Sequence, residues 1–287
     1  MSATSTRQST GNVIISTGDL TTIEGSRGTF TKQFPRPFIG TNRHRVGLLN
    51  CSIYNSWDNL SSAFRNLSGG SYRWIDGVEY PVQYPPGSYD IEQLNGFFHY
   101  TMRANGHFLL DNNGSEVFFV DFVVNTVYYR VTATMTPVPT TLPEGWSNPN
   151  AINLATGLAP QFLVAADTEW YRLIGFAPGA YPSVQDTNFH QVNGSLPPRI
   201  SPVSTVMIMC NWVNDNRFST RQSCIATFSP DVGTGELINF TPQVLSMYDV
   251  TPNTYTGIEI RFFDQNYTPL VIRDTEQTVI SLLITVD

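Results

Sequence analysis

Apolar residues along this chain fall in short runs or alternate with polar residues, and both patterns are typical of β-strands. In residues 127–135 every second residue is apolar, which predicts one buried face made of Val127, Tyr129, Val131, Ala133 and Met135. Together with residues 116–124, across the turn Asn125-Thr126, this segment predicts a hairpin. We expect about ten strands, drawn from residues 13–15, 46–54, 72–75, 78–84, 116–124, 127–135, 161–165, 170–176, 203–213, 237–247, 257–263 and 278–286.

One segment has the period of a helix instead. Its apolar stripe predicts packing against a sheet and consists of Ile91, Leu94, Phe98 and Met102. Asp90 is a good N-cap, and Gln93 three residues later completes the pattern of a capping box. Asn105-Gly106 then ends the helix as a left-handed C-cap would.

The order and spacing of these elements predict an all-β fold. Many strands of irregular spacing, joined by long loops, favour a single jelly-roll β-sandwich with one short helix and long loop insertions. Residues 1–11 have no apolar period and predict a flexible N-terminal arm. Residues 12–287 are then expected to form one jelly-roll domain, with an elaborated Pro- and Thr-rich loop at about 136–160.

Composition supports the β prediction. Charged residues are 14% of the 287 residues and aromatic residues are 13%, which excludes both a disordered chain and a coiled coil. The net charge of −7 argues against sequence-specific or general nucleic-acid binding. The charge is uneven, however, because residues 1–50 carry +4 and the remainder −11. One interpretation is an inward-facing basic arm that includes Arg7, Arg27 and Lys32; the other is an ordinary solvated surface.

The sequence contains no pattern of catalytic or metal-binding residues that we recognise. The four histidines lack metal spacing, and the three cysteines (Cys51, Cys210 and Cys224) are expected to be small buried side chains. We therefore predict no enzyme activity, no cofactor and no metal, although a pair of carboxylates, as in a glycosidase, stays an alternative. No secretory signal or long apolar segment is present, so we expect neither secretion nor membrane insertion.

The tryptophans leave a second function class open. Trp74, Trp170 and Trp212 fall in strand segments and are expected in the core. Trp57 and Trp146 fall in loops, where an aromatic ring can stack on a sugar or anchor an interface. A glycan- or receptor-binding β-sandwich is therefore the alternative to a structural protein, with Trp57 and Trp146 as its candidate contact residues.

The order of several weak motifs carries a family resemblance. These are residues 53–59 (IYNSWDN), 84–91 (YPPGSYDI), 173–176 (LIGF), 206–213, 228–230 (FSP), 258–266 and the apolar strand at the C-terminal end. The series, from about residue 44 onward, resembles the penton (minor capsid) proteins of virophages, Polinton-like viruses and adintoviruses.

That resemblance implies a single jelly roll that forms homopentamers at the fivefold vertices of an icosahedral double-stranded DNA virus capsid. The implied partners are other copies of the chain and the major capsid protein of the same virus, with a host surface receptor as a further candidate. The implied location is the virion, after synthesis in the host cytoplasm or nucleus. A double jelly-roll major capsid protein would need about twice as many strands. No catalytic residue is implied by the resemblance.

Overall fold

The computed structural model describes residues 10–16, 29–62, 64–213, 223–273 and 278–286. They form a mostly β structure that separates into two compact units. Unit 1 combines Met1–Trp57 with Val203–Asp287, and unit 2 is Asp58–Pro202. We predicted one domain over residues 12–287, and the structure differs because the segment between two jelly-roll strands has a hydrophobic core of its own.

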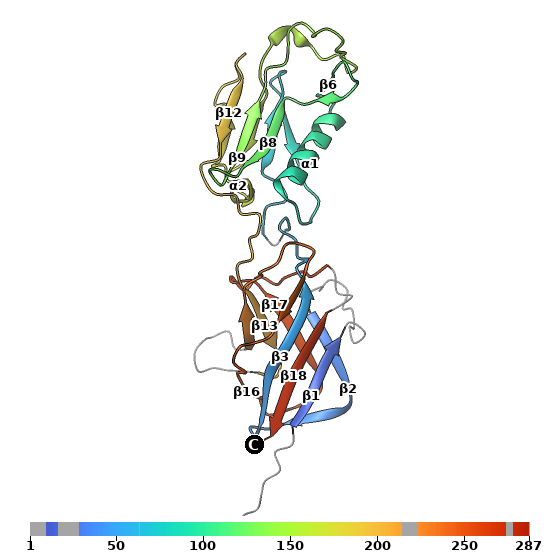
Figure 1. Cartoon of the computed structure of the whole chain (residues 1–287), viewed down its shortest axis with the longest axis vertical. Helices are drawn as coiled ribbons and strands as arrows, with labels where there is room; N and C mark the ends of the chain where they lie inside the picture. The colour runs from blue at the N-terminus through green and yellow to red at the C-terminus, as the bar shows by residue number, and fades with distance from the viewer. Residues whose placement is uncertain (1–9, 17–28, 63, 214–222, 274–277, 287) are drawn as a thin grey trace, which may run out of the picture. The chain divides into compact units, whose positions relative to one another are not determined.

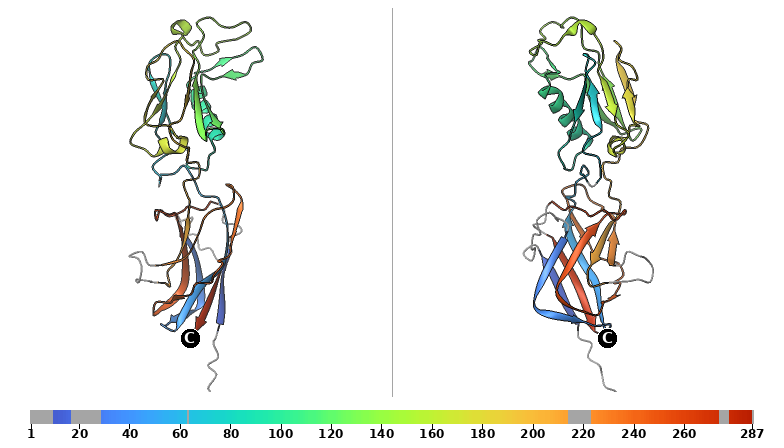
Figure 2. Two further views of the ribbon diagram at one scale, coloured as in Figure 1. Left: turned by 60° about the vertical axis from the view of Figure 1, so that its left-hand side comes forward. Right: turned by 180° about the vertical axis from the view of Figure 1, so that it is seen from behind.

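Unit 1 consists of two antiparallel sheets, which lie face to face (Figure 2). In the first sheet the strand order is β1 (Thr10–Ser16), β18 (Val279–Val286), β3 (His44–Tyr54) and β15 (Leu237–Phe240), and the short β16 (Tyr248–Asp249) also pairs with β3. In the second sheet the order is β14 (Cys224–Phe228), β13 (Val206–Cys210), β17 (Asn253–Phe263) and β2 (Thr29–Gly40).

The connections between these strands define the fold class. Along the chain, successive strands of unit 1 alternate between the two sheets. The exceptions are β13 and β14, which are neighbours in the second sheet, and the short β16, which follows β15 in the first sheet. Two four-stranded sheets wired in this way form a jelly roll, so the predicted fold class is confirmed. The whole of unit 2 is inserted between β3 and β13 (Figure 1).

Alternation of apolar and polar residues explains the core of unit 1. In β17 the buried side chains are Tyr255, Ile258, Ile260 and Phe262. A register shift between Tyr255 and Gly257 changes the spacing of this series by one residue, as a β-bulge does. The apolar strand β18 lies between β1 and β3, in the interior of the first sheet.

Unit 2 contains the remaining elements. Its four-stranded sheet has the order β11 (Gly179–Tyr181), β10 (Gln161–Val164), β4 (Gly70–Arg73) and β5 (Glu79–Val82). Its three-stranded sheet has the order β12 (His190–Asn193), β9 (Arg130–Met135) and β8 (Val120–Asn125). The other elements are α1 (Ile91–Ala104), β6 (Leu109–Leu110), β7 (Glu116–Val117), the 3-10 helix η2 (Leu154–Thr156) and α2 (Trp170–Ile174).

Helix α1 confirms its prediction in detail. The buried side chains are those of the predicted stripe, Ile91, Leu94, Phe98 and Met102. Asp90 Oδ1 accepts from the backbone N–H of Gln93 at 2.7 Å, and Gln93 Oε1 accepts from the N–H of Asp90 at 3.0 Å. These reciprocal bonds satisfy two donors that the first helical turn would otherwise leave unpaired.

One prediction in another segment was wrong, and one long strand was missed. Residues 170–176 were predicted as a strand, but they form α2, in which Trp170, Leu173 and Ile174 are buried at helical spacing. The run is too short for its period to separate the two structures. Residues 29–40, for which we predicted no element, form the long strand β2.

None of the helices in the described part of the chain is long and apolar enough to cross a membrane.

Candidate functional site

A hairpin tip in unit 2 exposes five apolar side chains within seven residues. We call Val123, Val124, Val127, Tyr128 and Tyr129 the apolar tip. Val127 and Tyr129 are each 78% exposed and Tyr128 is 65% exposed. No residue from 122 to 129 is charged, so this surface is suited to contact with an apolar partner.

The turn between β8 and β9 places these side chains outside the core. The predicted two-residue turn Asn125-Thr126 is in fact longer, because β9 begins only at Arg130. Tyr129 has a φ of +51°, which is unusual for a residue with a side chain. Val131, Ala133 and Met135 are buried as predicted, whereas Val127 and Tyr129 are not.

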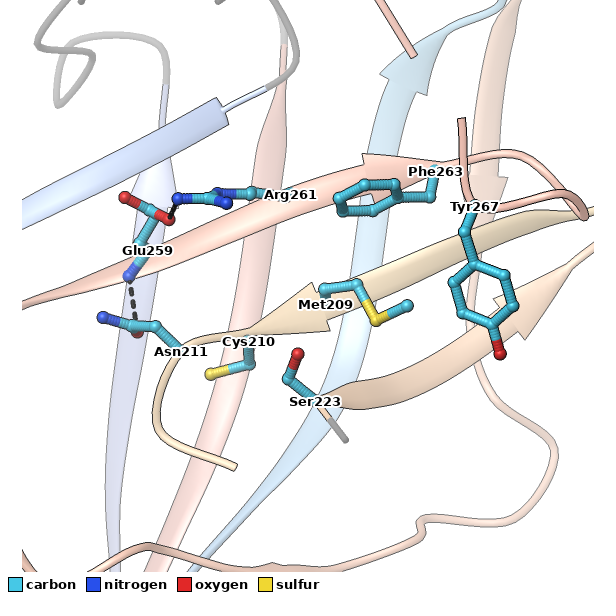
Figure 3. Close-up of a pocket in the computed structure, with 8 residues that line it drawn as sticks. All are labelled: Met209, Cys210, Asn211, Ser223, Glu259, Arg261, Phe263 and Tyr267. Atoms are coloured by element: carbon cyan, nitrogen blue, oxygen red, sulfur yellow. Dashed lines mark hydrogen bonds and ion pairs between the residues drawn. The ribbon is translucent and has the colours of Figure 1, made fainter. Parts of the chain in front are cut away.

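A second candidate surface is a pocket of about 410 Å³ on unit 1 (Figure 3). Its walls come from β13, β17 and neighbouring loops and consist of Met209, Cys210, Asn211, Ser223, Glu259, Arg261, Phe263 and Tyr267. Glu259 and Arg261 form an ion pair at 2.5 Å, and Asn211 Oδ1 accepts from the N–H of Glu259 at 2.8 Å. The pocket therefore offers apolar side chains beside a charge pair that is already satisfied internally.

The Cys210 thiol that lines this pocket is poorly reactive. Cys210 is its strongest potential nucleophile, but burial raises the pKa of the thiol to about 12. The thiolate, which is the reactive form, is therefore almost absent at neutral pH. Cys51 is also buried, and all three cysteines are free.

Unit 2 contains a buried polar and aromatic cluster around His107. Its Nδ1 lies 2.9 Å from the hydroxyl of Tyr72, and the side-chain amide of Asn105 donates to that hydroxyl at 2.9 Å. The ring of Trp74 stacks on the imidazole with 4.4 Å between centroids. Burial lowers the pKa of His107 to about 4, so this imidazole is a weak base at neutral pH.

Neither of the two predicted contact residues, Trp57 and Trp146, has a fully exposed side chain. Trp57 is only 6% exposed and pairs through its backbone with Ile272, so its prediction as a contact residue was wrong. Trp146 is half-buried and packs against the core of unit 2. The aromatic rings that are exposed include those of Tyr128, Tyr129 and Phe189.

The predicted basic arm is only partly within the described residues. Arg7 and Arg27 lie outside them. Lys32 lies in β2, where its Nζ donates to the carbonyl of Ile14 in β1 at 2.9 Å. Lys32 therefore belongs to the sheets of the jelly roll, and its assignment to an arm was wrong.

The apolar tip was missed by sequence reasoning although its residues were noted. Val127 and Tyr129 fit a two-residue period, so they were assigned to the buried face of a strand. The turn at Asn125-Thr126 was predicted, but its continuation to Tyr129 was not, because Val127, Tyr128 and Tyr129 are residue types that favour strands. In the residues that the structure describes, no group of three or more His, Cys, Asp or Glu side chains could hold a metal ion.

Comparison with known proteins finds structural similarities without a sequence match. No protein-family model and no curated protein sequence matches the chain. The chain is similar to the mavirus penton protein, with 10% sequence identity, a TM-score of 0.46 and coverage of 98% of both chains. It is also similar to a chain of the Sputnik virophage determined by cryo-EM, with 11% identity, a TM-score of 0.42 and coverage of 97% of both chains.

Proposed function

We propose that this chain is a structural, non-enzymatic virion protein: a penton subunit that forms pentamers at the fivefold vertices of an icosahedral double-stranded DNA virus capsid. The observation that carries the proposal is the jelly-roll wiring of unit 1, an architecture found in capsid proteins. Lectins and cupins share this architecture, so the order of motifs along the sequence is needed as a second support.

The residues that carry the family resemblance support a structural role, because several of them hold turns and junctions. Asn59 donates through Nδ2 to the carbonyls of Tyr89 and Ile200, at 2.7 and 2.8 Å. Asp264 Oδ1 accepts from the N–H groups of Asn266 and Thr268 and so closes the turn after β17. These motifs thus hold turns and junctions of the chain in place, as a rigid building block requires.

A subunit that assembles into a ring must carry contact surfaces for its two neighbours. A closed ring of identical subunits uses two different surfaces of each copy, which must match each other. The described surface includes an apolar tip on unit 2 and a mixed pocket on unit 1, which are two distinct candidates for such contacts. The major capsid protein of the same virus and a host surface receptor are the further partners that we propose.

Imaging of the purified full chain tests this function. Class averages from electron microscopy are expected to show rings with fivefold symmetry. Single particles of one chain at every concentration would contradict the proposal. If such a monomer bound a defined sugar on a glycan array, the alternative of a glycan-binding sandwich would replace it.

A further inference from the structure

The apolar tip is not explained by the folding of unit 2, because its side chains point away from the core. A soluble monomer rarely exposes a large continuous apolar patch unless the patch binds something. At about 150–250 Å² for each aromatic side chain, Tyr128 and Tyr129 together expose on the order of 300 Å². The three valines of the tip enlarge this surface further.

The position of the tip follows from how β8 runs beside α1. His99 Nε2 lies 2.8 Å from the carbonyl of Val120, and Asn95 Oδ1 accepts from the N–H of Phe122 at 3.0 Å. The strand therefore runs toward the beginning of the helix. From Phe122, three further strand residues advance about 10 Å, whereas α1 begins only about 6 Å beyond Asn95. The tip thus extends past the first turn of α1.

The same end of unit 2 holds both of its chain ends. Asn59, near the start of unit 2, is bonded to Tyr89 beside the helix start and to Ile200 near the end of the unit. Asp58 and Pro202 continue covalently into the jelly-roll strands of unit 1.

The tip also continues an open sheet edge. Strand β8 is the outer strand of its sheet, and Asn95 and His99 cover only the first part of its free edge. Further along that edge, the structure gives the backbone N–H and C=O of Val124 no bonded partner among the described residues. An open edge beside exposed apolar side chains is a surface to which another chain can pair.

The lack of basic side chains at the tip favours a protein partner over an anionic membrane. Residues 122–129 carry no basic side chain, the chain has a single lysine, and its net charge is −7. Peripheral contact with an anionic lipid surface draws on clustered Lys and Arg, which this tip lacks. A closed ring also needs a surface on each copy that contacts a different surface of the next copy, and the exposed apolar tip is available for such a contact.

We infer that the apolar tip is a subunit contact, occupied in the assembled protein by a second copy of this chain. This inference rests on the proposed penton function. A stable interface buries about 800 Å² on each partner, so the tip supplies its apolar centre and the neighbouring polar residues its rim.

The experiment compares the full chain with the double variant Tyr128→Ser/Tyr129→Ser by sedimentation and native mass spectrometry over a range of concentrations. We expect the double variant to raise the dissociation constant of the ring about tenfold or more, because buried aromatic side chains dominate interface energies. The thermal unfolding of the variant monomer should be unchanged, since both side chains are exposed in the monomer.

The matched control is Val184→Ser/Phe189→Ser, which removes two apolar side chains that are 72% and 56% exposed elsewhere on unit 2. It should leave the ring intact. A ring that survives the tip substitutions unchanged would overturn the tip contact while the penton function stands. A full chain that stays monomeric would overturn both.

Flotation with phosphatidylcholine vesicles tests whether the tip binds a lipid surface instead of a second copy of the chain. Vesicle binding by the full chain that the tip substitutions abolish, with an unchanged ring, would assign the tip to a lipid surface and overturn our inference. Photo-crosslinking from a benzoylphenylalanine at position 128 should join two chains, and crosslinks confined to one chain would also overturn it.

Discussion

At the scale of single residues, His107 shows how burial sets a pH dependence. The residue is 7% exposed, with Trp74 stacked on its ring and Tyr72 beside its Nδ1. Burial in this cluster disfavours the charged imidazolium, which lowers the pKa of His107 to about 4. The folded protein therefore holds a neutral imidazole over most of the range in which a free histidine titrates.

This environment predicts acid destabilisation of unit 2. An unfolded histidine titrates near pH 6.5, so as the pH falls the unfolded state binds a proton before the folded state does. We expect His107 to contribute a loss of about 1–3 kcal/mol in the free energy of unfolding between pH 7 and 4. Urea denaturation at both pH values should show a smaller loss for His107→Gln. Equal losses in the two proteins would contradict this prediction.

Trp57 provides a second test at the residue scale. Because its side chain is buried, Trp57→Ala should lower the free energy of unfolding by about 3–5 kcal/mol. Trp146→Ala, at a half-buried position, should cost less in the same denaturation experiment. Two equal and small effects would mean that Trp57 is a surface residue, as the sequence had led us to predict.

The burial of Trp57 could not be predicted from its neighbours. The segment 55–59 is polar and has no period, so nothing local indicates that an aromatic side chain there is covered. The partner segment around Ile272 lies more than two hundred residues away and is brought beside it by the jelly-roll wiring. Long-range topology therefore decided the environment of this residue.

At the scale of elements, α1 was predictable because every signal is local. Its stripe, N-cap and C-cap lie within seventeen residues, and Gly106 has the positive φ of +74° expected after the helix. The substitution Asp90→Ala removes one half of the capping box and should cost about 1 kcal/mol of unfolding free energy. Chemical denaturation checks this value. The exposed Glu92→Gln is the control, and an equal effect there would contradict the capping role.

The turn after α2 requires a glycine at position 175. Gly175 has a φ of +78°, and a Cβ at this position would collide with the backbone carbonyl oxygen of Leu196. Gly114 has a similar φ of +77° but open space around its Cα. We therefore expect Gly175→Ala to cost about 1–3 kcal/mol more than Gly114→Ala in denaturation experiments. Equal costs would show that the α2 turn can move away from Leu196.

Helix α2 itself was beyond prediction for a physical reason. Its buried Trp170 packs on β4, where a Cβ on Gly70 would approach the indole to 2.7 Å. The ring of Phe162 in β10 lies 5.8 Å from the same indole. These contacts join residues about 100 and eight positions apart in the chain. The helix is thus stabilised by tertiary packing that its own short apolar run does not encode.

At the scale of the whole molecule, the jelly roll was predictable but its limits were not. The strands of unit 1 have the alternation and apolar runs that predict a sandwich. Unit 2 was counted as part of that sandwich because its strands have the same local patterns. Which strands share a core depends on pairing over long distances, and residue periodicity contains no such information.

The central claim is that this chain is built to assemble with copies of itself into a closed ring of five. Native mass spectrometry of the full chain measures this number directly. Our account predicts a dominant species with the mass of five chains, which dissociates to monomers on dilution or activation. A chain that remains monomeric at every concentration, or that forms a closed ring of another number, would contradict it.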